Sequence, residues 1–231
     1  MHEHHISVGR TARYVVLGPT PKAAGIQEVW FVLHGYGQLA ATFVRQFEIL
    51  DDGTRLIIAP EALNRFYMTG VGSAPASERP VGATWMTRED RQHEIADYLA
   101  YLDALWGSIA ANLPDPLTLR LTVLGFSQGT ATAARWVSFG AAHPTHLLLW
   151  GGLLPPELDI ADPNHRLRDA ELRFVIGSKD GFVTDARLAE EESRMQAAGL
   201  PYEVVRYSGS HGIKRDPLLE LAHGIARQPH G

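Results

Sequence analysis

The residue best placed for chemistry is Ser127, at the centre of the Gly-Phe-Ser-Gln-Gly pattern of residues 125–129. The run 121–124 before it is apolar or β-branched, which is typical of a short buried strand, and the small residues after it suit a helix. A strand, a glycine-bounded turn and a helix form a nucleophile elbow, in which the serine hydroxyl projects above a sheet edge. The helix N-terminus presents free N–H groups at the same place. The pattern predicts a nucleophilic serine.

A serine hydroxyl is a weak nucleophile at neutral pH, so it needs a base to accept its proton and a carboxylate to orient that base. Ser127, Asp180 and His211 follow the chain order Ser, acid, His that this arrangement uses, each just beyond an expected strand. The rival acids are Asp169, which precedes its strand, and Asp185, inside the next helix. The histidines after Ser127 are His143, His146, His165, His211, His223 and His230. We favour His211 because it follows a strand within a flexible Gly-Ser-His-Gly segment.

Hydrolysis through an acyl-enzyme also needs two donors for the oxyanion. One is expected to be the backbone N–H of Gln128, directly after the nucleophile. The other is expected from the glycine-containing loop 34–37, where Tyr36 N–H is the first choice and Gly37 N–H the second. His34 is interpreted as a structural residue that supports this loop.

The elements needed to position these groups can be predicted from apolar patterns. Strands are expected at 11–17, 28–33, 55–60, 121–124, 146–150, 171–176 and 202–207. Helices are expected at 40–50, 88–112, 184–198 and 216–227, and from the elbow to about residue 140. This alternation predicts an α/β fold with a mostly parallel central sheet flanked by helices on both faces. Reactive groups in such sheets gather at the carboxyl ends of the strands.

Length and composition point to one globular domain over residues 1–231, with 45% hydrophobic and 20% charged residues. The net charge of −5 and the lack of basic clusters argue against nucleic-acid binding. The absence of cysteine excludes disulfides and thiolate chemistry. No secretory signal or membrane-spanning run is recognised, so a cytoplasmic protein without an integral membrane segment is expected, as a monomer or a homodimer.

Two further stretches stand out. Residues 63–84 are rich in Gly, Pro and Ser and are expected to be irregular. Long loops in compact domains are usually functional, so the segment 63–87 is predicted to form a wall of the substrate groove. Phe66, Tyr67 and Met68 are its apolar candidates, with ordinary loop packing as the alternative. The histidines at positions 2, 4 and 5 either bind a metal or belong to a frayed polar terminus, which is favoured.

Four motifs together resemble the phospholipase/carboxylesterase family of α/β-hydrolases, which includes acyl-protein thioesterase-like serine esterases. They are Leu-His-Gly-Tyr-Gly at 33–37, the elbow at 125–129, Gly-Ser-Lys-Asp-Gly-Phe-Val at 177–183 and Gly-Ser-His at 209–211. The resemblance implies the triad and oxyanion donors named above, and a tryptophan, Trp85, that lines the acyl site. The chain departs from the family at Gln38, where an aspartate is frequent, and at Met86 and Thr87, where Phe-Asp often follows the tryptophan. These positions lie near the expected substrate groove.

The sequence thus predicts a serine hydrolase of carboxylic esters, of the carboxylesterase, lysophospholipase or thioesterase type, that works without a cofactor or metal on a small-molecule ester or thioester. The candidate substrate-binding residues are Trp85, Gln38, Phe66 and Met68. One alternative is a peptidase of the same fold, because the same triad serves both reactions. Another is a hydrolase homologue that has lost activity and only binds ligands.

Overall fold

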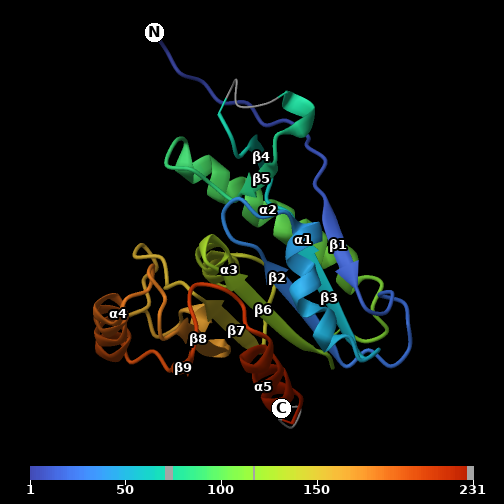
Figure 1. Ribbon diagram of the computed structural model, residues 1–231, viewed down its shortest axis with the longest axis vertical. Helices are drawn as coiled ribbons and strands as arrows, with labels where there is room; N and C mark the ends of the chain where they lie inside the picture. Colours follow the sequence, from blue (N-terminus) through green and yellow to red (C-terminus); the bar gives the residue numbers. More distant parts are fainter. Residues whose placement is uncertain (71–74, 117, 228–231) are drawn as a thin grey trace.

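A computed structural model describes residues 1–70, 75–116 and 118–227 (Figure 1). Its centre is a seven-stranded sheet in the order β1-β3-β2-β6-β7-β8-β9. Neighbouring strands run parallel except at the edge, where β1 is antiparallel to β3. The strands are β1 (Tyr14–Leu17), β2 (Glu28–Leu33), β3 (Arg55–Pro60), β6 (Arg120–Phe126), β7 (His146–Trp150), β8 (Glu171–Gly177) and β9 (Glu203–Tyr207). The predicted α/β architecture with a mostly parallel sheet is therefore confirmed.

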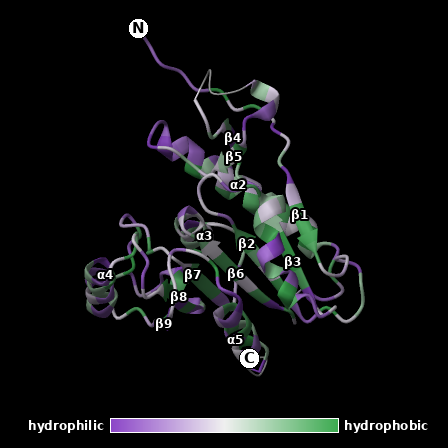
Figure 2. Cartoon of the chain, in the orientation of Figure 1, coloured by the Kyte–Doolittle hydropathy of each residue, from purple (hydrophilic) through white to green (hydrophobic). Residues whose placement is uncertain are grey.

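Helices cover both faces of this sheet, so the central strands are buried on both sides and read as continuous apolar runs. Phe31 of β2 belongs to the core cluster shared with α2 (Arg91–Ala110), α3 (Gln128–Phe139) and α4 (Asp185–Ala198). Its neighbour Trp30 packs in the opposite cluster with α1 (Ala40–Phe43), the 3-10 helix η1 (Val44–Leu50) and α5 (Arg215–Ala226). Figure 2 shows the hydrophobic colour concentrated on the central strands. Across the described ranges, every helix is too short or too polar to cross a membrane.

The three neighbouring strands β2, β3 and β6 begin on a buried ion cluster. Glu28, 2% exposed, accepts hydrogen bonds from Arg55 Nε at 2.8 Å, from Arg120 Nη2 at 3.1 Å and from Trp30 Nε1 at 3.0 Å. Buried charges are tolerated when they are paired and hydrogen-bonded in this way. Because each partner sits at or near the first residue of its strand, the cluster fixes the register of the three strands whose far ends carry the candidate site.

The segment predicted as one helix over 40–50 differs in the structure. A short α1 is followed by the 3-10 helix η1. The buried residues Val44, Phe47 and Leu50 recur at every third position, which matches three residues per turn better than 3.6. The segment has an apolar face, as predicted, but the three-residue spacing of that face favours a 3-10 helix over an α-helix.

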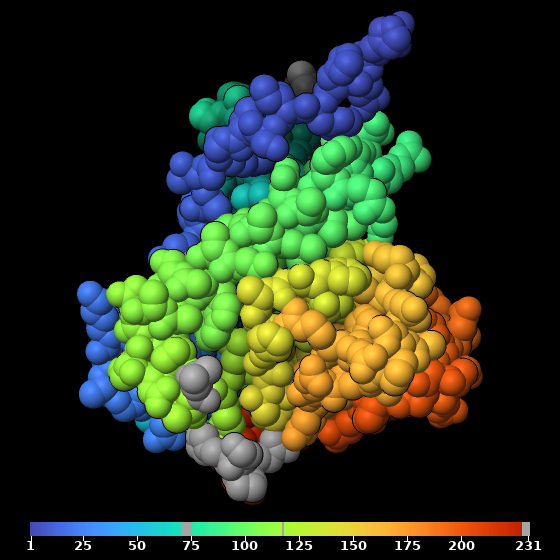
Figure 3. All heavy atoms as spheres, turned by 180° about the vertical axis from the view of Figure 1, so that it is seen from behind, coloured from blue at the N-terminus to red at the C-terminus, as the bar shows by residue number. Residues whose placement is uncertain are grey.

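The expectation that residues 63–84 are irregular is wrong. Two strands, β4 (Asn64–Tyr67) and β5 (Val81–Thr84), pair antiparallel, and a 3-10 turn, η2 (Ala76–Glu78), lies between them. Residues 71–74 of the predicted loop lie outside the described part. The hairpin projects beyond the end of the central sheet (Figure 1). The N-terminal segment lies across it and beside α2 (Figure 3), where Arg10 donates to Asn64 Oδ1 and to Leu63 O.

Candidate active site

Ser127 sits in a strained turn between β6 and α3. Its backbone has φ 53° and ψ −114°, and Ser127 is one of two non-glycine residues with positive φ in the described ranges. Its N–H donates to Trp150 O at 2.9 Å. A Cβ on Gly125 would lie 2.2 Å from Gly129 O, and one on Gly129 would lie 2.3 Å from Leu33 O. Only glycine permits these approaches. The turn therefore has the geometry of a nucleophile elbow, and strain of this kind is concentrated at functional sites.

Asp180 and His211 form a directly hydrogen-bonded pair. The distance from His211 Nδ1 to Asp180 Oδ2 is 2.8 Å, and the Asp180 side chain is fully buried. Burial raises the pKa of Asp180, but hydrogen bonds from Val183 N–H, His211 and Phe182 N–H outweigh it, so the net pKa lies below the ordinary value. An ionised carboxylate only accepts hydrogen bonds, so Nδ1 of His211 must carry the proton. In the neutral ring Nε2 is then the free base.

Two contacts place this base beside the nucleophile. The His211 ring packs on Phe126, with centroids 5.0 Å apart. The ring also lies against Gly151, where a Cβ would come within 2.9 Å of His211 Cε1. Gly151 directly follows Trp150, and the carbonyl of Trp150 accepts the hydrogen bond from Ser127 N–H. Within the described ranges no hydrogen bond joins Ser127 Oγ to His211. Such bonds are often long without substrate and tighten in the reacting complex.

The rival acids and bases lie elsewhere. Asp185 is the first residue of α4 and pairs with Arg206 at 2.8 Å, with its side chain 87% exposed. Asp169 ends the 3-10 helix η3 (Arg166–Asp169) before β8. His146 is buried beside Glu171 at the opposite, amino end of the sheet. His230 lies outside the described residues. Asp180 and His211 are the pair that the fold brings to Ser127.

The loop after β2 leaves one of its two candidate oxyanion donors available. Gly37 N–H donates to Ala83 O at 2.9 Å, so it is already engaged. Gly35 N–H donates to Gln38 Oε1 at 2.8 Å. Tyr36 N–H makes no hydrogen bond to any residue that the structure describes. A Cβ on Gly35 would lie 3.2 Å from Ser127 Cβ, so the loop runs directly past the nucleophile. This geometry favours Tyr36 over Gly37.

His34 supports that loop through both of its ring nitrogens. Its Nδ1 lies 2.7 Å from Gly35 O, and its Nε2 lies 3.0 Å from the nitrogen of Ala62, a backbone donor. A carbonyl accepts and an N–H donates, so this is the neutral tautomer with the proton on Nδ1, and both nitrogens are engaged. Burial lowers the pKa of His34, against smaller raising effects from Gly35 O and Glu61. The interpretation of His34 as structural agrees with this geometry.

The lowered pKa makes His34 a source of acid sensitivity. The unfolded chain takes up a proton near pH 6.5 and the native state only at lower pH, so stability is full above about pH 6.5 and falls as the pH drops below it. The loss approaches about 1.4 kcal/mol per pH unit between the two pKa values. Urea unfolding at pH 7.5 and pH 5.0 should show a smaller difference for His34→Gln than for the wild type. Equal differences for both proteins would contradict the assignment, and the exposed His223→Ala is the control.

The side chain of Gln128 joins the elbow to the hairpin. Its Nε2 donates to Thr84 Oγ1 and to Met86 O, both at 2.9 Å, and its Oε1 accepts from Trp85 N–H at 3.1 Å. Trp85 in turn donates from its indole to His34 O at 2.8 Å. The end of β5 is thereby bonded to both sides of the site: to the residue after the nucleophile and to the loop 34–37, which carries the candidate oxyanion donors and is hereafter the oxyanion loop. Sequence reasoning assigned Gln128 only its backbone N–H, because side-chain partners so distant in sequence leave no local pattern.

The candidate substrate-binding residues fall into two groups. Trp85 is only 1% exposed and lies beneath the site against His34, so the structure gives it a supporting position and not a place on the groove surface. Gln38 likewise holds the loop through Gly35 N–H. Met68 is 54% exposed, and Phe66 is half-buried against Tyr36, with ring centroids 5.1 Å apart. These two remain candidates for contact with substrate.

One apolar residue at the site was missed. Phe182 is 65% exposed, and its ring centroid lies 4.5 Å from that of His211. It belongs to the acid motif 177–183, and its place two residues after Asp180 was the available signal. Together with Tyr36, which is 62% exposed, it gives the candidate site an exposed aromatic rim.

Two surface depressions lie away from this chemistry. One, of about 350 Å³, is lined by residues 168–173 and 201–203, and the other, of about 310 Å³, by residues of β8, β9 and α5. Both involve Arg173 and Glu203, near the amino ends of β8 and β9, whereas Ser127 follows the carboxyl end of β6. Neither depression contains the acid, the base or the nucleophile, so neither is the candidate site.

Comparison with known proteins identifies solved structures of similar fold. No protein-family model and no curated protein sequence matches the chain. Among solved structures it is similar to acyl-protein thioesterase 2 from Zea mays, at 18% identity and TM-score 0.66 over 94% of this chain and 98% of that one. A carboxylesterase from Mesorhizobium loti gives 18% identity and TM-score 0.68, with 94% of this chain and 95% of that one covered. A phospholipase/carboxylesterase from Dyadobacter fermentans DSM 18053 gives 19% identity and TM-score 0.64, with 96% of this chain and 99% of that one covered.

These structures are similar to the chain over nearly their whole length. Because the sequence identities are low, the similarity establishes the fold alone. The chain therefore has the α/β-hydrolase fold, and its structural neighbours support the resemblance to the phospholipase/carboxylesterase family.

Proposed function

We propose that the protein is a serine hydrolase that cleaves carboxylic esters or thioesters through an acyl-enzyme. The observation that carries the proposal is the Asp180–His211 hydrogen bond of 2.8 Å, because it leaves Nε2 of His211 as a base next to the strained Ser127. The structural neighbours include a thioesterase and carboxylesterases, which agrees with this reaction class.

The first half of the reaction forms the acyl-enzyme. Ser127 Oγ attacks the acyl carbon while His211 Nε2 accepts the hydroxyl proton. The negative charge that develops on the carbonyl oxygen is held by the N–H groups of Tyr36 and Gln128. The tetrahedral intermediate collapses, and His211 returns the proton to the departing alkoxide or thiolate. Buried Asp180 holds the imidazole in position and stabilises its charged form.

The second half releases the acid. Water attacks the acyl carbon and gives a proton to His211 Nε2, and the same N–H groups hold the second oxyanion. Ser127 leaves as the alkoxide and is reprotonated by His211. The carboxylic acid departs and the free enzyme is restored, with every proton balanced within the cycle.

The rim of the site favours an apolar substrate group. Phe182, Tyr36 and Met68 are each more than half exposed. Phe182 packs on His211, Met68 lies next to Gly37 of the oxyanion loop, and Phe66 packs on Tyr36 of the same loop. Exposed apolar side chains gathered at one site mark a binding surface. Hydrolysis rates in a series of p-nitrophenyl esters should therefore increase from acetate to longer acyl chains. Aminoacyl amides, assayed beside them, test the peptidase alternative.

Covalent labelling tests the proposal directly. A fluorophosphonate should label the native protein with one equivalent at Ser127, because the probe reacts with serines that a neighbouring base activates. Mass spectrometry of the intact protein and of its peptides measures stoichiometry and position. The folded Ser127→Ala variant is the matched control and should take up no label. Failure to label folded wild-type protein, or equal labelling of both proteins, would overturn the proposal and favour the inactive binding homologue.

A further inference from the structure

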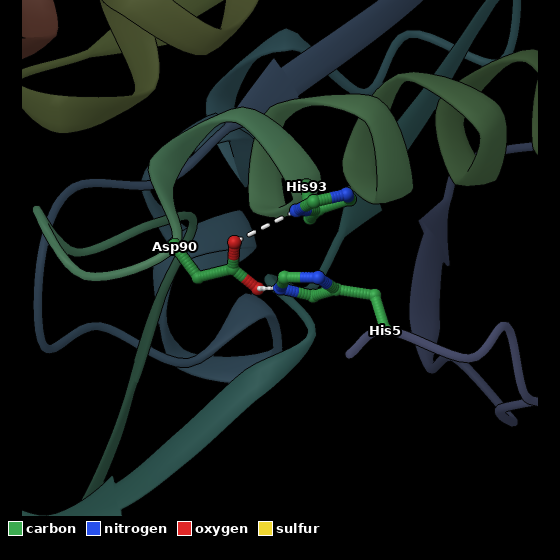
Figure 4. A group of neighbouring side chains, drawn as sticks. All are labelled: His5, Asp90 and His93. Carbon is green, nitrogen blue, oxygen red and sulfur yellow. Dashed lines mark hydrogen bonds and ion pairs between the residues drawn. The ribbon is translucent and has the colours of Figure 1, made fainter. Parts of the chain in front are cut away.

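Three metal-ligating side chains meet on the surface at the start of α2, outside the catalytic group (Figure 4). His5 Nε2 lies 3.2 Å from Asp90 Oδ2, and His93 Nδ1 lies 2.7 Å from Asp90 Oδ1. All three donor atoms lie within 4.8 Å of one another. Donors bound to a tetrahedral zinc ion at about 2.0–2.1 Å are separated by about 3.3 Å, so the three atoms need only small movements to close on one ion.

Two of the three side chains come from the same helix start. Asp90 precedes the first residue of α2 and has a left-handed backbone, with φ 48° and ψ 36°. His93 stands three residues later, and its N–H donates to Asp90 O at 3.1 Å. Residues three apart at a helix start lie on the same side. The third ligand, His5, comes from the N-terminal segment, and its ring stacks on that of His93 with centroids 4.1 Å apart.

We propose that His5, Asp90 and His93 form a zinc site that attaches the N-terminal segment to the start of α2. Two imidazoles and one carboxylate suit zinc, whereas calcium and magnesium prefer oxygen ligands throughout. All three residues are exposed, so water completes the coordination. The site is separate from the proposed hydrolysis, in which no step uses a metal.

The proposed site would add a second attachment point to an N-terminal segment that is already bonded to the hairpin. Arg10 bonds to Leu63 and Asn64 at the base of the hairpin, while Ile6 and Val8 are 87% and 78% exposed. Apolar packing therefore does little to hold residues 1–9. A metal bound between His5 and α2 fixes their other end, so that the segment is tied at two points.

The histidine-rich terminus offers a competing way to bind zinc. His2 and His4 belong to the same segment, and in the structure they lie outside the three-residue group. Chelation by these histidines alone would need neither Asp90 nor His93. The two arrangements predict opposite responses to substitution on α2 and in the terminus.

Calorimetric titration of the chelator-treated protein with zinc chloride distinguishes them. The wild type should bind one zinc ion. His93→Ala and Asp90→Asn should each weaken binding at least about tenfold, since loss of a ligand should cost no less than the 10–100-fold typical of an outer-shell partner. The double variant His2→Ala/His4→Ala should retain the wild-type affinity within about twofold, as should His223→Ala, which removes an exposed histidine of α5.

Hydrogen exchange gives a second readout that does not depend on affinity alone. Zinc should slow exchange in residues 1–9 of the wild type and leave it unchanged in His93→Ala. No zinc binding by the wild type would overturn the proposal. So would wild-type affinity in His93→Ala, or loss of binding in the His2→Ala/His4→Ala protein, which would assign the metal to the terminus alone.

Discussion

Asparagine in place of Asp180 should lower kcat for ester hydrolysis about 10⁴-fold while the protein stays folded. The reason lies in the other oxygen of this carboxylate, which accepts N–H bonds from Phe182 at 2.8 Å and Val183 at 3.0 Å. An asparagine must turn its carbonyl toward these two donors, so its NH₂ group faces His211. That group donates to Nδ1 and moves the ring proton to Nε2. His211 then has no lone pair to offer Ser127.

The size of this effect separates a catalytic aspartate from a merely structural one. Asp185→Asn is the matched control, because Asp185 is an exposed aspartate at the start of α4 that pairs with Arg206. It should leave kcat within about twofold of the wild type, as surface changes usually do. Circular dichroism and a thermal melt show whether Asp180→Asn is folded. A folded Asp180→Asn protein with less than a tenfold loss of kcat would remove Asp180 from the triad.

Methionine in place of Gln128 should lower kcat about 100-fold with a smaller change in KM, since a displacement of about 1 Å in a catalytic group has an effect of this order. The backbone N–H of residue 128 is retained. What is lost is the amide that bonds Thr84, Trp85 and Met86, and with it the fixed position of the oxyanion loop. In the proposed mechanism the loop stabilises the charge of the transition state, so the loss should appear mainly in kcat.

The control for this variant is Gln196→Met on α4, whose amide donates to the hydroxyl of Tyr202, a residue that lines the depression near the amino ends of β8 and β9. It should keep the wild-type kcat. Thr84→Val, which removes only the hydroxyl between Gln128 and Met86, should give an intermediate loss. An unchanged kcat in folded Gln128→Met would show that the hairpin does not position the oxyanion loop. A rise in KM alone would assign Gln128 to substrate binding instead.

The sequence was most informative where residues are buried on both faces. The strands 28–33 and 55–60 agree with β2 and β3 to the residue, because every position in them is buried and the apolar runs have clear limits. The hairpin was missed for the opposite reason. In β4, half-buried and exposed residues alternate over only four positions, and the partner strand lies beyond a stretch rich in Gly, Pro and Ser. Pairing so distant along the chain gives little local signal.

The candidate site divides in the same way. Ser127, Asp180 and His211 could be proposed because each follows a strand, and the topology of a parallel sheet brings such positions to one edge. The contacts that support these three residues could not be predicted from the sequence. Nothing in the residue type of Trp85 tells whether it faces substrate or lies buried with its indole N–H on His34 O. That choice depends on three-dimensional packing between the hairpin, the oxyanion loop and the elbow.

The hairpin leaves and rejoins the body of the protein at one place, because its first residue, Asn64, pairs with its last, Thr84. Its outer part can be lengthened, shortened or exchanged without moving any strand of the central sheet. The stretch from Gly82 to Met86 cannot be exchanged so freely. A Cβ on Gly82 would lie 2.6 Å from Gly37 O, Ala83 O accepts from Gly37 N–H, and the Gln128 side chain is bonded to Thr84 and Met86. The fold thus contains an interchangeable module with a fixed attachment point. Grafts from the structural neighbours that keep Gly82–Met86 should alter the substrate range of the proposed hydrolase and leave its chemistry intact.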